Sequence, residues 1–330
     1  MLSTKLLKCA ILSLTLVTNS IHGAIPLVTW NDTENRSAII EFTERVTSKS
    51  SPTFVPPSER IAVFDNDGTL LCEKPNYTQM QFSVDQMKAT ATQHPEWNDV
   101  AYIQQLISAP RETPVTLEGR DWLDVFSRTT QRLTVETFAQ NVAQWLESAR
   151  HPDFHAPYPS LTYLPMKELI HYLSANDFQV YIVTGSSIGF MRQWAPSTLG
   201  IPEERIIGSR MEMEYENVDG ALRIVHGSKI ERFNIAANKP VAIHEAIGKK
   251  PIFAFGNSIG DLEMLEWASS NEHHSMSLVL LHDDEEREYA YDEKTKIYAL
   301  AKARAWKVVR MKHDFESVFS QTVGQRSRAK

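Results

Sequence analysis

Five short apolar runs that alternate with helix-like segments constrain the fold of this chain most strongly. The runs are IAVF (61–64), VYIV (180–183), PIFAF (251–255), SLVLL (277–281) and WKVV (306–309). Their length suits strands that are buried on both faces, and apolar residues at helical spacing lie between several of them, as in 33–48, 166–175 and 261–268. Parallel sheets covered by helices show this alternation. We therefore predict an α/β fold with a Rossmann-like, doubly wound and mostly parallel sheet.

Two segments depart from the alternation. Residues 73–162 contain no convincing strand but several helical faces, with Thr134 placed to cap one of them. This segment is predicted to be a helical insert between the first and second core strands. In 210–225 apolar residues alternate on either side of Asp219-Gly220, which is typical of a β-hairpin.

The N-terminus has the order of a secretory signal peptide. Lys5 and Lys8 precede the apolar run CAILSLTLV (9–17), and small and polar residues follow as far as 24. We expect cleavage after residue 23 or 24, so that 1–24 is a signal peptide and the protein is exported. The run is too short to span a bilayer, which predicts no stable membrane anchor.

Composition narrows the class of partner. The net charge of −7, with no long basic run, argues against a nucleic-acid surface. Cys72 is the only cysteine beyond the signal peptide, so no internal disulfide is expected, and we interpret it as a small core residue. The sequence does not indicate an oligomeric state.

Three of the predicted strands end in polar loops that contain glycine. The loops are DNDGT (65–69), TGSS (184–187) and GNSIGD (256–261), and Lys239-Pro240 opens the helical stretch before the third. In an open α/β sheet, ligands bind beyond the carboxyl ends of the strands. The three loops and the lysine are therefore predicted to form one divided site.

A calcium-binding EF-hand loop is the rival interpretation of DNDGT. With Gly68 at the invariant sixth position, Val63 and Lys74 would have to be the first and last ligands, and neither side chain can bind calcium. A strand also precedes the acids where an EF-hand requires a helix. We therefore reject this interpretation.

Paired carboxylates suit phosphoryl transfer. One can attack phosphorus while the other protonates the leaving oxygen. Two carboxylates and a phosphate repel by about 4 kcal/mol per pair of unit charges at 4 Å and an effective dielectric of 20, so the site needs cations. Mg²⁺ and Lys239 are the expected ones, and hydroxyl groups of the 184–187 loop would hold phosphoryl oxygens.

The four elements resemble the motifs of the haloacid dehalogenase superfamily, over about 58–72 and 161–312. The chain looks closer still to exported bacterial hydrolases described as phosphoserine-phosphatase-like, through FVPPSERIAVFDNDGTL, PIFAFGNSIGDLEMLEW and REYAYD. The resemblance implies a Mg²⁺-dependent phosphatase of small phosphate esters that works through an aspartyl-phosphate. It also implies a bacterial periplasmic or secreted protein, with an α/β core at 25–72 and 163–330 and a helical cap at 73–162.

Carried over by position, the resemblance assigns roles to individual residues. Asp65 would be the nucleophile and a metal ligand, and Asp67 the general acid and base, with its carbonyl on the metal. Lys239 would balance charge on the nucleophile and the phosphate, and phosphoryl binding would fall to the turn Thr184, Gly185 and Ser186.

The last loop departs from the family pattern. Asn257 stands where an acid usually follows the glycine, while Asp261 keeps the second acidic place. Both are candidate metal ligands, and which of them contacts the ion directly stays open. We expect Asn257 to weaken metal binding.

The aromatic residues of the cap, His282 and the acidic run at 283–288 are interpreted mainly as structural. Most aromatic residues of the cap are predicted to be core, with a cage for a quaternary ammonium as the lesser alternative. His282 is predicted to lie in a surface loop and 283–288 to begin a solvated helix.

The alternative functions are a non-catalytic exported protein that binds metal or phosphate, and a phosphotransferase or mutase of the same superfamily.

Overall fold

The computed structural model describes residues 26–110, 113–115, 117, 120–291 and 296–326. Its strands are β1 (Ile61–Phe64), β2 (Gln179–Ser187), β3 (Ile206–Val218), β4 (Ala221–Arg232), β5 (Phe253–Gly256), β6 (Met276–Leu281) and β7 (Lys307–Arg310). Its helices are α1 (Glu34–Thr47), α2 (Thr78–Thr90), α3 (Ala101–Ser108), α4 (Arg120–Thr130), α5 (Val135–Ser148), α6 (Leu164–Ala175), α7 (Ile188–Met191), α8 (Ala195–Leu199), α9 (Asn238–Ile247), α10 (Leu262–Ser269), α11 (Lys296–Ala303) and α12 (Met311–Asp314).

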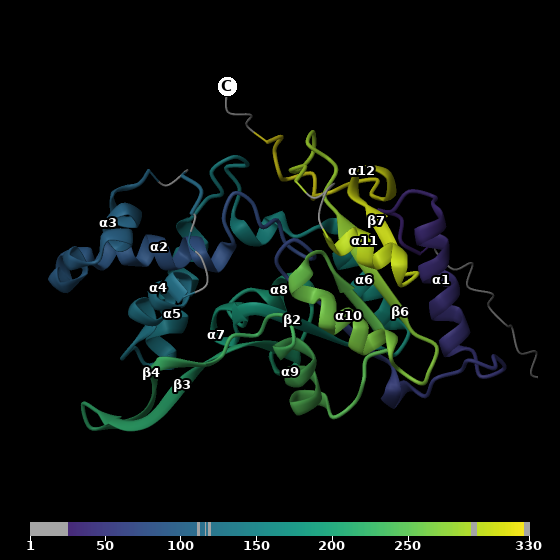
Figure 1. Cartoon of the computed structure of the whole chain (residues 1–330), viewed down its shortest axis with the longest axis horizontal. Coiled ribbons are helices and arrows are strands. Elements are labelled where there is room, and N and C mark those ends of the chain that lie inside the picture. Colours follow the sequence, from purple (N-terminus) through teal and green to yellow (C-terminus); the bar gives the residue numbers. More distant parts are fainter. Residues whose placement is uncertain (1–25, 111–112, 116, 118–119, 292–295, 327–330) are drawn as a thin grey trace, which may run out of the picture.

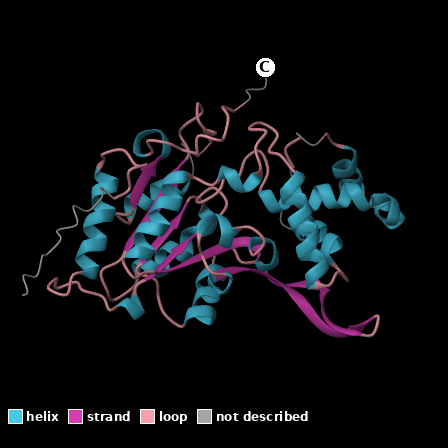
Figure 2. Ribbon diagram, turned by 180° about the vertical axis from the view of Figure 1, so that it is seen from behind, coloured by secondary structure: helices cyan, strands magenta, loops and turns pink. Residues whose placement is uncertain are grey.

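Within the described residues the strands form one seven-stranded sheet, in the order β4-β3-β2-β1-β5-β6-β7 (Figures 1 and 2). All neighbours pair in parallel except β3 and β4, which are antiparallel. The predicted doubly wound, mostly parallel sheet is confirmed. Because β1 lies between β2 and β5, the polar residues at the carboxyl ends of these three strands meet at one edge of the sheet. The predicted loop 184–187 is the last part of β2, where the pairing with β3 is irregular.

Helices cover both faces of the sheet, as the continuous apolar strands require. Along β1, Ala62 and Phe64 pack into a core with α1 and α6, whereas Ile61 and Val63 pack into a second core with α9, α10 and α11. All four side chains are buried. The sheet is therefore a rigid support for the loops at its carboxyl edge.

The helical cap predicted between the first two core strands is confirmed. Helices α2 to α5 lie beside the sheet, on the left of Figure 1, and part of the cap has its own core around Met87, Trp97 and Ile103. The predicted domain boundaries at residues 72 and 163 stay a prediction.

The hairpin of β3 and β4 joins the sheet to the cap. Its turn residues, Asp219 and Gly220, have φ angles of 52° and 83°, the positive values that a tight two-residue hairpin turn requires. Farther down, the backbone of His226 exchanges hydrogen bonds with the cap, accepting one from the N–H of Arg132 and donating one to the carbonyl of Leu133, both at 2.9 Å. The hairpin spans 206–232, which is longer than the predicted 210–225, and its His226 contact supports the cap.

No helix in the described part of the chain is long and apolar enough to cross a bilayer. The predicted signal peptide at 1–24 lies outside the described residues.

Candidate active site

The DNDGT loop turns sharply where β1 ends. The N–H of Asp65 donates to a carbonyl of β5 at 2.9 Å, and the carbonyl of Asn66 accepts from the three N–H groups of 69–71. Gly68 has a φ of +76°, and a Cβ at this position would lie 2.0 Å from the amide nitrogen of Asn257. The left-handed backbone and this close approach together require glycine.

Lys239, near the start of α9, lies between two carboxylates. Its Nζ donates to Asp65 Oδ1 at 2.5 Å, to Asp261 Oδ1 at 2.6 Å and to the carbonyl of Val183 at 2.9 Å. The Lys239 side chain is buried, so these contacts replace its hydration. Three predicted site residues from distant parts of the sequence therefore form one buried charge cluster.

The cluster has more negative than positive charge. Burial raises the pKa of Asp65 well above its usual range, and the nearby Asp261 carboxylate adds to the effect. Burial also raises the pKa of Asp67. Burial lowers the pKa of Lys239, but Asp261 and Asp65 outweigh it, so that the net shift is upward and the ammonium is stabilised. The site is therefore suited to a further cation.

The predicted phosphate-binding turn lies beside Asp67. The hydroxyl of Thr184 accepts the N–H of Ser186 at 3.0 Å and is fully buried. The hydroxyl of Ser186 donates to Asp67 Oδ2 at 3.2 Å. Gly185 lies between them and, with Ser186, lines the same cavity as Asp65 and Asp67.

Asn257 and Asp261 have different surroundings. Both oxygens of Asp261 are engaged, because Oδ1 accepts from Lys239 and Oδ2 accepts from the N–H groups of Asn257 and Ser258, each at 3.0 Å. Asn257 instead lies against Gly68, and its Oδ1 accepts from the hydroxyl of Thr69 at 3.3 Å. Asp261 thus holds the loop and the lysine, while Asn257 faces the DNDGT turn.

Comparison of the sequence with models of known protein families identifies one match, and the matched range contains the site residues. The haloacid dehalogenase-like hydrolase family model matches residues 62–266, more than half of the chain. The chain belongs to the haloacid dehalogenase-like hydrolase family. The matched range runs from β1 to α10 and contains the DNDGT loop, the end of β2 at 184–187, Lys239 and the GNSIGD loop.

Several solved structures are similar to this chain at low sequence identity. A functionally unknown protein from Anaerococcus prevotii is 17% identical, with a TM-score of 0.54, over 84% of this chain and 91% of that one. A protein of unknown function from Bordetella pertussis is 15% identical, with a TM-score of 0.49, over 76% of this chain and 98% of that one. A phosphoserine phosphohydrolase-like protein from Francisella tularensis is 16% identical, with a TM-score of 0.43, over 76% of this chain and 94% of that one. The similarity to the Anaerococcus prevotii protein shows a shared fold and nothing more. No curated protein matches the chain.

The donor atoms of this hydrolase fit a hard divalent cation. Among the described residues no three acidic, histidine or cysteine side chains form a ready metal cluster, so an ion here would also need amide, carbonyl or water oxygens. One carboxylate oxygen of Asp67, Oδ1, is buried without a hydrogen-bond partner. This unpaired oxygen and the excess of carboxylates over ammonium groups match the oxygen-rich sites that Mg²⁺ prefers.

Gln79 is a site residue that the sequence analysis missed. This buried residue of α2 accepts the N–H of Ser187 at 2.6 Å and donates to the Ser187 hydroxyl at 3.0 Å. The cap is thereby tied to the turn that carries Ser186. A glutamine among other polar residues of a helix carries no periodic signal, because its partner lies 108 residues away.

The predictions for His282 and for 283–288 are wrong. His282 is fully buried, and its Nε2 lies 2.7 Å from the carbonyl of Gly68, while Nδ1 lies 3.1 Å from Glu288. Glu288 is also fully buried, and residues 283–288 form a turn instead of a helix. Glu285 and Glu286 are exposed, but Asp283 and Asp284 are buried, the first held by Arg310 and the second by Arg287.

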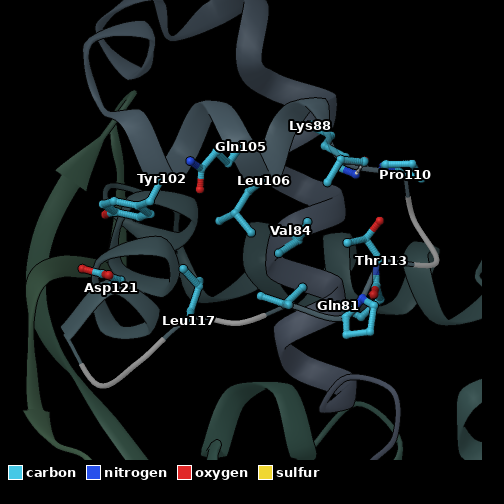
Figure 3. A pocket seen from close by; sticks show the side chains of 13 residues that line it. Gln81, Val84, Lys88, Tyr102, Gln105, Leu106, Pro110, Thr113, Leu117 and Asp121 are labelled. Carbon is cyan, nitrogen blue, oxygen red and sulfur yellow. Dashed lines mark hydrogen bonds between the residues drawn. The ribbon is translucent and has the colours of Figure 1, made fainter.

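Cavities of similar size lie in and beside the cap, and one of about 380 Å³ lies between α5 and the hairpin. A cavity of about 460 Å³ opens beside Asp65, Asp67 and Lys239, between the cap and the core. Another, of about 400 Å³, lies within the cap among residues such as Tyr102 and Leu106 (Figure 3) and contains none of the predicted site residues. The cavity beside Asp65, Asp67 and Lys239 is therefore the candidate active site.

Proposed function

We propose that this hydrolase is a Mg²⁺-dependent phosphomonoesterase that acts on small phosphate esters through an aspartyl-phosphate on Asp65. The observation that carries the proposal is the position of Asp65 and Asp67 in one cavity, the first held by Lys239 and the second by Ser186. The two carboxyl groups thus have different environments, which suits two different chemical roles.

The chemistry divides between the two acids. A carboxylate oxygen of Asp65 would attack phosphorus while the ester P–O bond breaks, and Asp67 would give its proton to the leaving alkoxide. Burial raises the pKa of both carboxyl groups, but the ammonium of Lys239 opposes this at Asp65 through direct contact, so we assign the ionised nucleophile to Asp65 and the proton donor to Asp67. Water would then attack the phosphorus of the aspartyl-phosphate, with Asp67 taking its proton, and inorganic phosphate would leave.

Cations make this reaction electrostatically feasible. Lys239 would hold Asp65 in place and offset part of the charge on the phosphoryl group. A bound Mg²⁺ would supply the remaining positive charge, held by Asp65, the carbonyl of Asp67 and the amide oxygen of Asn257. Because both oxygens of Asp261 already accept hydrogen bonds, we assign it to anchoring Lys239 and the loop.

The test is the release of p-nitrophenol from its phosphate ester with Mg²⁺, by the native protein and by Asp65→Asn. Asp65→Asn should abolish turnover, whereas Asp99→Asn, at an exposed position of the cap, should not change it. Borohydride reduction during turnover should convert Asp65 to homoserine, detectable by mass spectrometry. Turnover that is independent of Asp65 would refute the proposal. Phosphate transfer to added alcohols without hydrolysis would favour a phosphotransferase.

We also propose that residues 1–24 direct export to the periplasm or medium of a bacterium. The support is the basic start and the short apolar run of this segment. Mass spectrometry of the N-terminus in fractionated cells tests this proposal. An intact N-terminus in the cytoplasmic fraction would contradict it.

A further inference from the structure

Large apolar side chains from both the cap and the core line the active-site cavity, and together they are called the apolar wall: Tyr77, Met80, Trp122, Phe233, Ile235 and Ile259. The same cavity is lined by the polar residues Asp65, Asp67, Ser186 and Lys239, where the phosphate would bind. A cavity with both apolar and polar lining is typical of a site that orients a ligand with two unlike parts.

Part of this wall is exposed to water. Tyr77, Ile235 and Ile259 have exposed fractions of 45%, 39% and 49%, which are unusual for large apolar side chains. Exposed apolar groups that gather around a cavity mark a binding surface more often than scattered ones do. A ligand that covers them would gain the free energy of removing this surface from water.

The wall begins next to the phosphate-binding turn. A Cβ at Gly185 would lie 3.1 Å from Ile235 Cγ2 and 4.0 Å from the ring of Phe233. Because Gly185 has no side chain, these apolar groups reach the turn directly. An ester whose phosphoryl group lies between Asp65 and Ser186 would therefore place its leaving group close to the wall.

Charge at the cavity also limits the leaving group. The carboxyl group of Glu73 lines the same cavity, and Lys74 lies 3.8 Å from one of its oxygens. Among the described lining residues one is basic, Lys239, and its ammonium already contacts Asp65 and Asp261. A second anionic group on the substrate would thus meet carboxylates and an apolar surface.

We infer that the preferred substrate, given the phosphatase function proposed above, is a monoester of an apolar alcohol such as an aryl alcohol, without a second negative charge. This substrate class differs from phosphoserine, whose leaving group carries a carboxylate. The apolar wall, the missing side chain at Gly185 and the acidic group at Glu73 all favour it.

Two esters that differ by one charge provide the test. The measurement is kcat/KM for phenyl phosphate and for 4-carboxyphenyl phosphate with Mg²⁺. We expect phenyl phosphate to be preferred by about tenfold or more, because the wall would leave the carboxylate without a partner. Chemical reactivity favours the opposite order, since the carboxyphenolate is the weaker base.

A matched pair of variants connects the preference to the wall. Ile235→Lys would place an ammonium at the wall and should reduce or invert the preference for phenyl phosphate. Ile224→Lys changes an equally exposed isoleucine, 38% against 39%, on the hairpin outside the cavity lining, and should leave the preference unchanged. Circular dichroism and thermal unfolding check that both variants fold.

The outcomes separate this inference from the proposed function. Turnover that depends on Asp65, with equal or better use of 4-carboxyphenyl phosphate, overturns the inference and keeps the phosphatase. Preference for phosphocholine over phenyl phosphate also overturns it, because the wall would then hold a cation. If turnover of every ester is absent or independent of Asp65, both are wrong.

Discussion

Gln79 and Ser187 are joined by two hydrogen bonds, at 2.6 and 3.0 Å, between the first helix of the cap and the turn that follows Thr184. One bond satisfies a buried backbone N–H and the other a buried hydroxyl. The cap is therefore attached directly to the group of atoms proposed to hold phosphate, and a change in its position would reach Ser186 through this contact.

Gln79→Leu should lower kcat/KM by about ten- to a hundredfold, because the turn would lose the contact that fixes its position. The buried N–H of Ser187 would also lose its partner, at a cost of about 1–3 kcal/mol in unfolding free energy. Steady-state kinetics and chemical denaturation measure the two effects.

Gln81→Leu is the matched control for this prediction. Gln81 is a buried glutamine on the same helix whose partners, Asn76 and Asp85, lie in the cap. It should lose stability to a similar degree and keep its activity. Equal losses of activity in both variants would show that Gln79 has no special role in positioning the turn.

His282→Ala should destabilise the protein by about 3–5 kcal/mol, as expected when one member of a buried charged pair is removed. Both nitrogens of His282 face acceptor oxygens, of Glu288 and of Gly68, so the imidazolium form satisfies both. Burial opposes ionisation of Glu288, yet the pKa of Glu288 is lowered because His282 outweighs that effect. Denaturant unfolding measures the loss.

His273→Ala, at an exposed position, controls for the loss of an imidazole and should be nearly neutral. The double variant of His282→Leu with Glu288→Leu should lose less stability than the sum of the single changes, because no charge remains buried alone. Strict additivity would rule out the proposed pairing.

Asn257→Asp should lower the Mg²⁺ concentration for half-maximal activity, because a carboxylate binds a divalent cation more strongly than an amide does. In EDTA the same variant should melt at a lower temperature than the native protein, since it adds a carboxylate to a site that already holds Asp65, Asp67 and Asp261. Asn98→Asp, at an exposed position of the cap, is the control. An unchanged Mg²⁺ requirement would show that Asn257 does not contact the ion.

The free energy of unfolding should fall in acid, and His226 should account for part of the decrease. This histidine is buried where the hairpin contacts the cap. Burial lowers the pKa of His226, and its Nδ1 has no hydrogen-bond partner. The unfolded chain therefore binds this proton more readily than the folded protein. The stabilising contribution of neutral His226 is fully present above about pH 6.5, the ordinary pKa of histidine. It is lost as the pH falls below this value.

His226→Leu should make the melting temperature less sensitive to pH between 7 and 5. The effect should be partial, because burial also lowers the pKa of His151. His273→Ala, which removes an exposed imidazole, is the control for the substitution. A variant of His226 with the same pH dependence as the native protein would contradict the assignment.

The sequence by itself determined the elements whose signals are local. The strand over 61–64 was predicted at its observed bounds, because its four apolar residues are followed by turn-forming ones. Asp65, Thr184, Lys239 and Asn257 could be grouped from the sequence alone, since parallel strands bring their carboxyl ends to one edge. Each needed only a local pattern and a general rule of topology.

The tertiary structure decided which side chains meet. Gln79 and Ser187 are 108 residues apart, and His282 and Gly68 are 214 apart, so no local pattern connects them. His282 was predicted to lie in a surface loop because it follows the end of a predicted strand. It is buried because Glu288 and the carbonyl of Gly68 provide partners that only the fold brings within reach. The apolar wall likewise combines cap and core residues, and its chemistry depends on packing between segments that the sequence keeps separate.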